Sequence, residues 1–71
     1  MRHLRAYRHH NVTVVTHTAG EPTFSGRLVR ATRAGLLLAS VELLDDGRAA
    51  TDLTGRLWIP ADNIATVQIE E

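Results

Sequence analysis

Hydrophobic and polar residues alternate along much of this chain, and alternation with a period of two is typical of β-strands that bury one face. Glycine, proline and acidic residues interrupt the alternating stretches where short turns are needed. On this basis we predict five strands, at Val12–Thr18, Thr23–Thr32, Leu36–Leu44, Ala49–Ile59 and Ile64–Ile69. The predicted fold class is mostly β, with antiparallel strands joined by short turns.

The second predicted strand has a glycine in its interior. Phe24, Gly26 and Leu28 share one face of this strand. An interior glycine marks either a strong bend or the close approach of another backbone. We favour the bend, because the strands of a small barrel must curve through two of its sides.

The third predicted strand, Leu36–Leu44, is apolar on both faces. Leucine favours helix, so a buried helix is an alternative for this stretch. Gly35 before it and the Asp46-Gly47 pair after it favour a strand, because Asp-Gly is a strong hairpin signal.

An abrupt corner follows the fourth predicted strand. Pro60 fixes its own φ and has no N–H group, so the strand must stop there. Asp62 and Asn63 accept the tight backbone that comes next. A corner of this kind between two strands is what a very small β-barrel needs to close on itself.

Residues 1–10 are predicted to form a short helix, because Leu4 and Tyr7 are three apart and Met1 extends their stripe. Asn11 would then end the helix as a C-terminal cap. A disordered basic arm is the alternative, since so short a helix is marginal unless it docks. We therefore predict a single domain, 1–71, with a helix at 1–10 and a barrel at 11–71.

Composition adds an argument for self-association. The chain has 71 residues, 44% of them hydrophobic, and no cysteine. A domain of this size is close to the lower limit for folding alone, and it has no disulfide or thiolate-bound zinc to stabilise it. Pairing with further copies is the remaining route to more buried surface.

The formal net charge is zero, with eight arginines and no lysine among the basic residues. A globally basic nucleic-acid binder is therefore not indicated, but two groups of arginines are candidates for local contacts with phosphate. They are Arg2, Arg5 and Arg8 in the first segment, and Arg27, Arg30 and Arg33 around the end of the second strand. An ordinary solvated flank is the alternative for each group.

The order and spacing of several short motifs resembles the Sm-like family. The matching residues are Val12-x-Val14, Gly20, Phe24-x-Gly26-x-Leu28, Leu36-x-Leu38 and Ile59-Pro60-Ala61-Asp62-Asn63-Ile64-x-x-Val67. The resemblance covers nearly the whole chain and implies a short helix followed by a five-stranded, strongly bent antiparallel Sm-like or SH3-like barrel. Small Arg-, Ala- and Thr-rich chains of this kind are similar to those of GC-rich actinobacteria and their phages.

The resemblance also implies a ring, in which the fourth strand of one subunit pairs with the fifth strand of the next. Trp58, which alternates away from Leu57 and Ile59, is predicted to anchor this contact, because tryptophan dominates interface hot spots. Base stacking and burial in the core are the alternatives for Trp58. The remaining predicted interface residues are Leu37, Val41, Ile64, Val67 and Ile69.

The resemblance breaks down at the family's RNA pocket. The Arg-Gly pair of its second motif is replaced by Pro60-Ala61, and Thr32 and Gly35 stand near the places of its Asp and Asn. The usual uridine pocket is therefore not expected.

No enzymatic, metal or cofactor site is predicted. His9 and His10 are adjacent and point in different directions on a helix, and no acidic cluster lies beside them. No Ser-His-Asp arrangement, pair of catalytic carboxylates or phosphate-binding glycine loop is readable. So small a domain rarely holds a catalytic cavity.

We predict a homo-oligomeric ring module that binds single-stranded RNA or DNA through a basic helix face or pore. The alternative is a structural protein, of a phage particle or a larger complex, that contacts only proteins. A monomeric SH3-like adaptor is a third hypothesis. We expect a cytoplasmic protein, or a virion-associated one if a phage encodes it, since neither a membrane span nor a signal peptide is readable.

Overall fold

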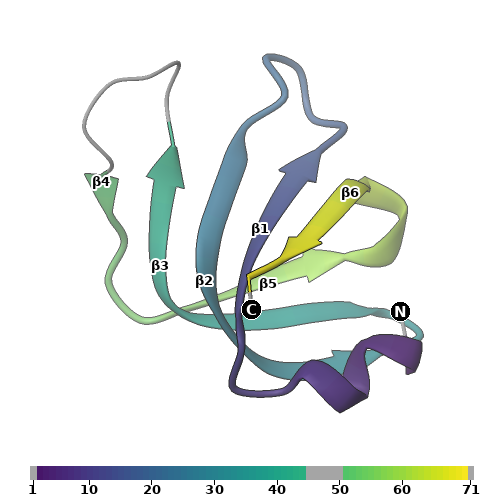
Figure 1. Cartoon of the computed structure of the whole chain (residues 1–71). Helices are drawn as coiled ribbons and strands as arrows, with labels where there is room; N and C mark the ends of the chain where they lie inside the picture. Colours follow the sequence, from purple (N-terminus) through teal and green to yellow (C-terminus); the bar gives the residue numbers. More distant parts are fainter. Residues whose placement is uncertain (1, 45–50, 71) are drawn as a thin grey trace.

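One antiparallel sheet contains every strand of the computed structural model, which describes residues 2–44 and 51–70 (Figure 1). The strands are β1 (Asn11–Thr16), β2 (Thr23–Thr32), β3 (Gly35–Leu44), β4 (Thr51–Asp52), β5 (Arg56–Pro60) and β6 (Ile64–Ile69). The described residues also form two 3-10 helices, η1 (Arg2–Tyr7) before β1 and η2 (Ala61–Asn63) between β5 and β6. The predicted class, mostly β with antiparallel strands, is confirmed.

The strands follow the order β4-β3-β2-β1-β6, and β5 also pairs with β3. Among the described residues β5 and β6 each pair with one strand only, β3 and β1 respectively. No backbone pairing between β5 and β6 is present in the described residues, so the sheet is open between these two strands. The corner at Pro60 therefore does not close the sheet into a hydrogen-bonded barrel.

Two of the five predicted strands, Thr23–Thr32 and Ile64–Ile69, have the predicted bounds. The first ends at Thr16 rather than Thr18, because His17 and Thr18 bond to η2 instead. The His17 N–H donates to the Asn63 carbonyl at 2.9 Å, and the Asn63 amide donates to the Thr18 hydroxyl at 2.9 Å. These bonds hold the corner against the end of β1.

The fourth strand was predicted as one piece over 49–59, and the structure divides its described part into β4 and β5. Gly55, with φ of +85°, lies in the break between them. The predicted Asp-Gly hairpin lies outside the described residues.

The β2–β3 pair is bent by irregular register. The pairing shifts between Ser25 and Arg27 and again between Leu28 and Arg30. At Gly26 an added Cβ would lie 2.9 Å from the Ala39 carbonyl oxygen. Gly26 thus combines the two roles of an interior glycine, because the strand is irregular there and the backbone of β3 comes close.

A bulge in β3 changes which residues face the core. Ser40 has φ of +53°, and β3 pairs with β5 before this residue and with β4 after it. Leu36 and Leu38 point inward before the bulge, and Val41 points inward after it, each at most 2% exposed. The inward positions therefore change from even to odd numbers at Ser40.

Leu4 fixes the N-terminal segment on the sheet, because its side chain is buried in the same core cluster as Leu28 and Ala31. The predicted helix over 1–10 is corrected to a shorter 3-10 helix that ends at Tyr7. Asn11 does not cap it but begins β1. The His9 N–H donates to the Leu28 carbonyl at 2.7 Å, so this docked segment is not a disordered arm.

In the described part of the chain, no helix has the length and apolar character that crossing a membrane requires.

Candidate functional site

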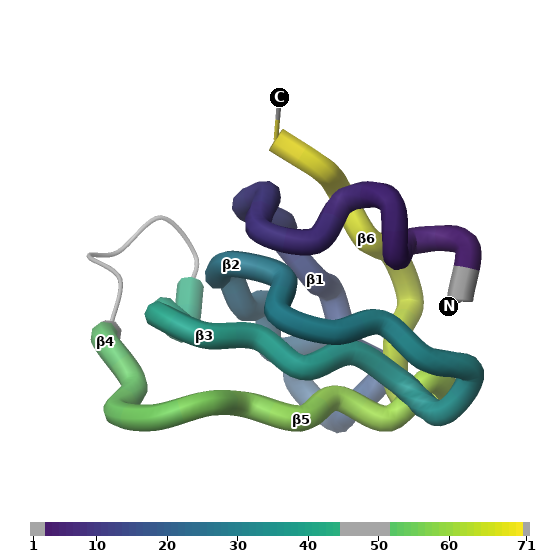
Figure 2. Tube along the Cα trace, turned by 90° about the horizontal axis from the view of Figure 1, so that it is seen from below, coloured from purple at the N-terminus to yellow at the C-terminus, as the bar shows by residue number. Residues whose placement is uncertain are grey.

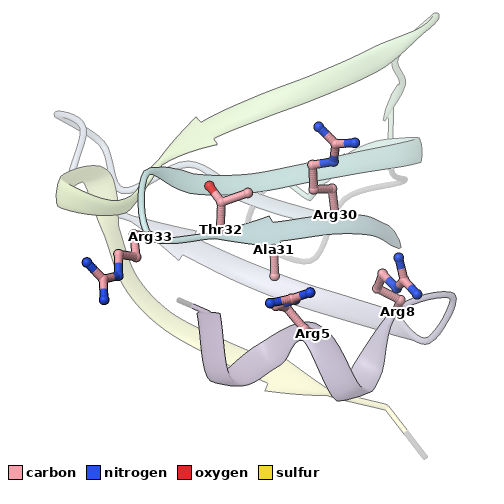
Figure 3. Close-up of a pocket in the computed structure, with 6 residues that line it drawn as sticks. All are labelled: Arg5, Arg8, Arg30, Ala31, Thr32 and Arg33. Carbon is pink, nitrogen blue, oxygen red and sulfur yellow. The ribbon is translucent and has the colours of Figure 1, made fainter.

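A depression of about 460 Å³ lies between η1 and the end of β2 (Figure 3). We call it the arginine depression, and its lining consists of Arg5, Arg8, Arg30, Ala31, Thr32 and Arg33. Arg5 and Arg8 come from the N-terminal segment, in η1 and in the turn after it, Arg30 comes from β2, and Arg33 comes from the turn that follows β2. Four cations from separate segments thus surround one concave surface.

The fold positions the two sides of the depression independently. Burial of Leu4 fixes η1 beside β2, and leaves the side chains of Arg5 and Arg8 exposed. On the other side, the Thr32 hydroxyl accepts a hydrogen bond from the Ala34 N–H at 3.1 Å. This bond shapes the β2–β3 turn, in which Arg33 is exposed.

The lining side chains come from both faces of β2. Figure 3 shows Ala31 pointing toward η1, while Arg30 and Thr32 point the opposite way. Successive residues of a strand alternate in this manner. Arg30 therefore belongs both to the depression and to the outer face of the sheet.

The depression is strongly basic within a protein of zero net charge. Its lining contains four arginines and no carboxylate. A guanidinium stays protonated at all physiological pH values and matches the geometry of a phosphate group. Like charges gathered in a concave surface raise the local positive potential and attract anions.

The four guanidinium groups do not converge on one point. In Figure 3 Arg33 and Arg8 lie at opposite ends of the depression, with Arg5 and Arg30 between them. A single small anion would touch only part of this set. The spread suits a chain of negative charges.

Five of the six arginines predicted to contact nucleic acid can be placed with their side chains, and all five are exposed. Four of them line the depression, whereas Arg27 lies on β2 outside it. Arg2 is part of η1, and its side chain lies outside the described part of the chain. The two arginine groups, which the sequence presents as separate candidates, thus contribute to one site.

The predicted interface residues divide into three sets. Trp58 is 44% exposed and faces outward as the alternation predicts, with the half-buried Leu37 opposite it in register. Val67 and Ile69 are partly buried and pack against the core. For these four residues, an interface role stays a prediction.

Val41 and Ile64 are buried in the chain's own core, with exposed fractions of 2% and 8%. Their prediction as interface residues is therefore corrected. Strict alternation along β3 would place Val41 outward beside Leu37, and the bulge at Ser40 turns it inward. Ile64 follows η2 directly and packs into the core cluster. Neither side chain is offered to a neighbouring subunit.

Arg56 is an exposed arginine that the sequence reasoning missed. It lies opposite Ala39 on β5, two residues before Trp58, and therefore on the same face of that strand. The alternation of Arg56, Trp58 and Pro60 against Leu57 and Ile59 could have revealed it.

Within the residues that the structure describes, no group of three or more histidine and acidic side chains is arranged to hold a metal ion.

A scan against protein-family models finds no match to this chain, and a search of curated proteins finds no sequence of significant similarity.

Proposed function

We propose that this protein binds nucleic acid through the arginine depression. The observation that carries the proposal is the lining itself, in which four arginines from three segments meet without a carboxylate. Phosphate contacts from arginine supply the sequence-independent part of nucleic-acid affinity. The spread of the guanidinium groups from one end of the depression to the other supports an extended phosphate backbone as the ligand.

Binding of a fluorescently labelled oligonucleotide, followed by anisotropy at several salt concentrations, tests this proposal. Four contacts to a single strand predict a slope of log affinity against log salt of about −2.8, since each contact contributes about −0.7. Affinity should then fall roughly 50-fold between about 50 and about 200 mM salt. Absence of binding at the lower salt concentration would refute the proposed function.

We further propose that the chain has the Sm-like arrangement and assembles into a homo-oligomeric ring. The element order, the one-turn corner η2 and the open edges of β5 and β6 support this proposal. An open edge presents unpaired backbone N–H and C=O groups, which a strand of another copy can satisfy. In the ring, β5 of one subunit would pair with β6 of the next.

The mass in solution tests the assembly. Light scattering at low and high concentration should give a multiple of the 7.8 kDa chain mass that does not change with dilution. A particle of the chain mass at both concentrations would contradict the ring and favour a monomeric adaptor.

A structural protein that contacts only other proteins is the second candidate. The same open edges favour it, because strand addition serves protein partners as well as copies of the chain. A stable oligomer that binds no oligonucleotide at low salt would support this candidate over the first.

A further inference from the structure

The outer face of β2, β3 and β5 carries a tryptophan on β5, with one arginine beside it along β5 and two more on β2. Across these strands Arg30 lies opposite Leu37, and Leu37 lies opposite Trp58. The next row in register consists of Arg27, Ala39 and Arg56. Residues opposite one another in antiparallel strands point to the same side of the sheet. We call this surface the Arg–Trp face, defined by Arg27, Arg30, Arg56 and Trp58.

The side chains at the centre of this face are largely buried, whereas the side chain of Trp58 protrudes into solvent. Ala39 is buried and Leu37 is half-buried, whereas Trp58 is 44% exposed. Strand geometry places the Cα atoms of Arg30 and Trp58 about 10 Å apart, across two strands, and those of Arg56 and Trp58 about 7 Å apart. Long guanidinium side chains at these distances can meet the phosphates on either side of a base that lies on the indole.

The Arg–Trp face is continuous with the arginine depression. Figure 2 shows β3 between β2 and β5, with η1 on the far side of β2. Arg30 lines the depression and also begins the row that leads to Trp58. A strand of phosphates bound along η1 would therefore continue over β2 toward β5.

We propose that the Arg–Trp face makes this protein selective for single-stranded nucleic acid. An unpaired base stacks on Trp58, while Arg30 and Arg56 contact the flanking phosphates. In a duplex the bases are stacked on one another, so an indole on a sheet face cannot reach a base plane. The proposal rests on the proposed function and adds to it the strandedness of the ligand and the residue that reads it.

Charge and geometry favour an unpaired base, and not a neighbouring subunit, as the group that contacts Trp58. Pairing of β5 with another strand uses backbone groups at the sheet edge, and it places the side chains of that strand beside Trp58 without covering the indole from above the sheet. A second copy of the same face would oppose arginine with arginine. The acidic residues Glu42 and Asp52 lie opposite each other in a separate row, so they limit the face at one end.

Trp58 is the only tryptophan of the chain, so its emission reports on this face alone. An oligothymidylate should quench this emission in a saturable way at about 50 mM salt, and a duplex of the same length should quench it little. Trp58→Ala should weaken single-strand binding about 5- to 150-fold, because one stacked base is lost. The salt slope should not change, since no phosphate contact is lost. Trp58→Phe should retain most of the affinity.

Four results would overturn the inference. If no oligonucleotide changes the anisotropy signal, the proposed function fails and the inference fails with it. If the oligothymidylate binds without quenching, or if Trp58→Ala binds it as tightly as the original protein, the proposed function stands and the role of Trp58 is wrong. If Trp58→Ala lowers the particle mass and the loss of affinity follows the loss of mass, Trp58 is a subunit contact instead.

Discussion

Gly35→Ala should leave the protein without a cooperative unfolding transition above room temperature. Gly35 begins β3 opposite Pro60, with φ of +157°. A Cβ at this position would collide with the Ile59 carbonyl oxygen and lie 3.0 Å from the Pro60 Cα atom. Both obstacles are backbone, so neither can move aside by rotation of a side chain.

The expected cost of Gly35→Ala is comparable to the stability of the whole domain. Overpacking costs about 1–3 kcal/mol, and a backbone forced into a sparsely populated conformation costs about as much again. A single core of this size rarely supplies more than about 3–5 kcal/mol. The substitution also separates β3 from β5, the strand that carries Arg56 and Trp58.

Gly20→Ala is the matched control for this experiment. Gly20 has φ of +87°, but a Cβ there would have no neighbouring atom within 4 Å. The control should therefore lose only about 1 kcal/mol, or about 4–8 °C in melting temperature. Circular dichroism of both variants at one protein concentration makes the comparison. A melting temperature of Gly35→Ala equal to that of Gly20→Ala would show that β3 and β5 can separate without loss of the fold.

The parts of the fold that sequence predicts well are those where alternation runs without interruption. β6 has the predicted bounds, and Trp58 faces outward on β5 as its neighbours Leu57 and Ile59 require. On β5 the pleat of the strand determines which side chain is buried, whereas β6 departs from alternation at its start, where Ile64 is buried and both Ala65 and Thr66 are exposed. The same alternation along β5 places Arg56 on the face of Trp58, although Arg56 was not among the predicted site residues.

Bulges and docking are the parts that the sequence does not reveal. The positive φ of Ser40 reverses the inward positions of β3, and a serine carries no signal of that conformation. Val41 was misplaced for this reason. Arg5 and Arg8 line the same depression as Arg30 because Leu4 packs beside β2. This packing is a contact between distant parts of the chain. Local patterns contain no information on such a contact.

Replacing all four arginines of the arginine depression by alanine should abolish most nucleic-acid binding. The affected residues are Arg5, Arg8, Arg30 and Arg33. Their side chains are exposed, so each substitution should change the free energy of unfolding by no more than about 0.5 kcal/mol. If four phosphate contacts are lost, affinity at about 50 mM salt should fall on the order of 10³-fold, and the magnitude of the salt slope should fall by about 2.8, which leaves only the contribution of Arg56.

A variant with lysine at the same four positions distinguishes charge from a general effect of substitution. Lysine keeps the positive charge but not the planar fork that binds phosphate through two donors. The lysine variant should therefore retain the salt slope of the original protein, with a smaller loss of affinity. Anisotropy titrations of both variants, with melting temperatures to verify folding, make the measurement. Retention of both affinity and salt slope by the alanine variant would place the nucleic-acid contacts elsewhere on the molecule, because nothing in the depression could then neutralise phosphate.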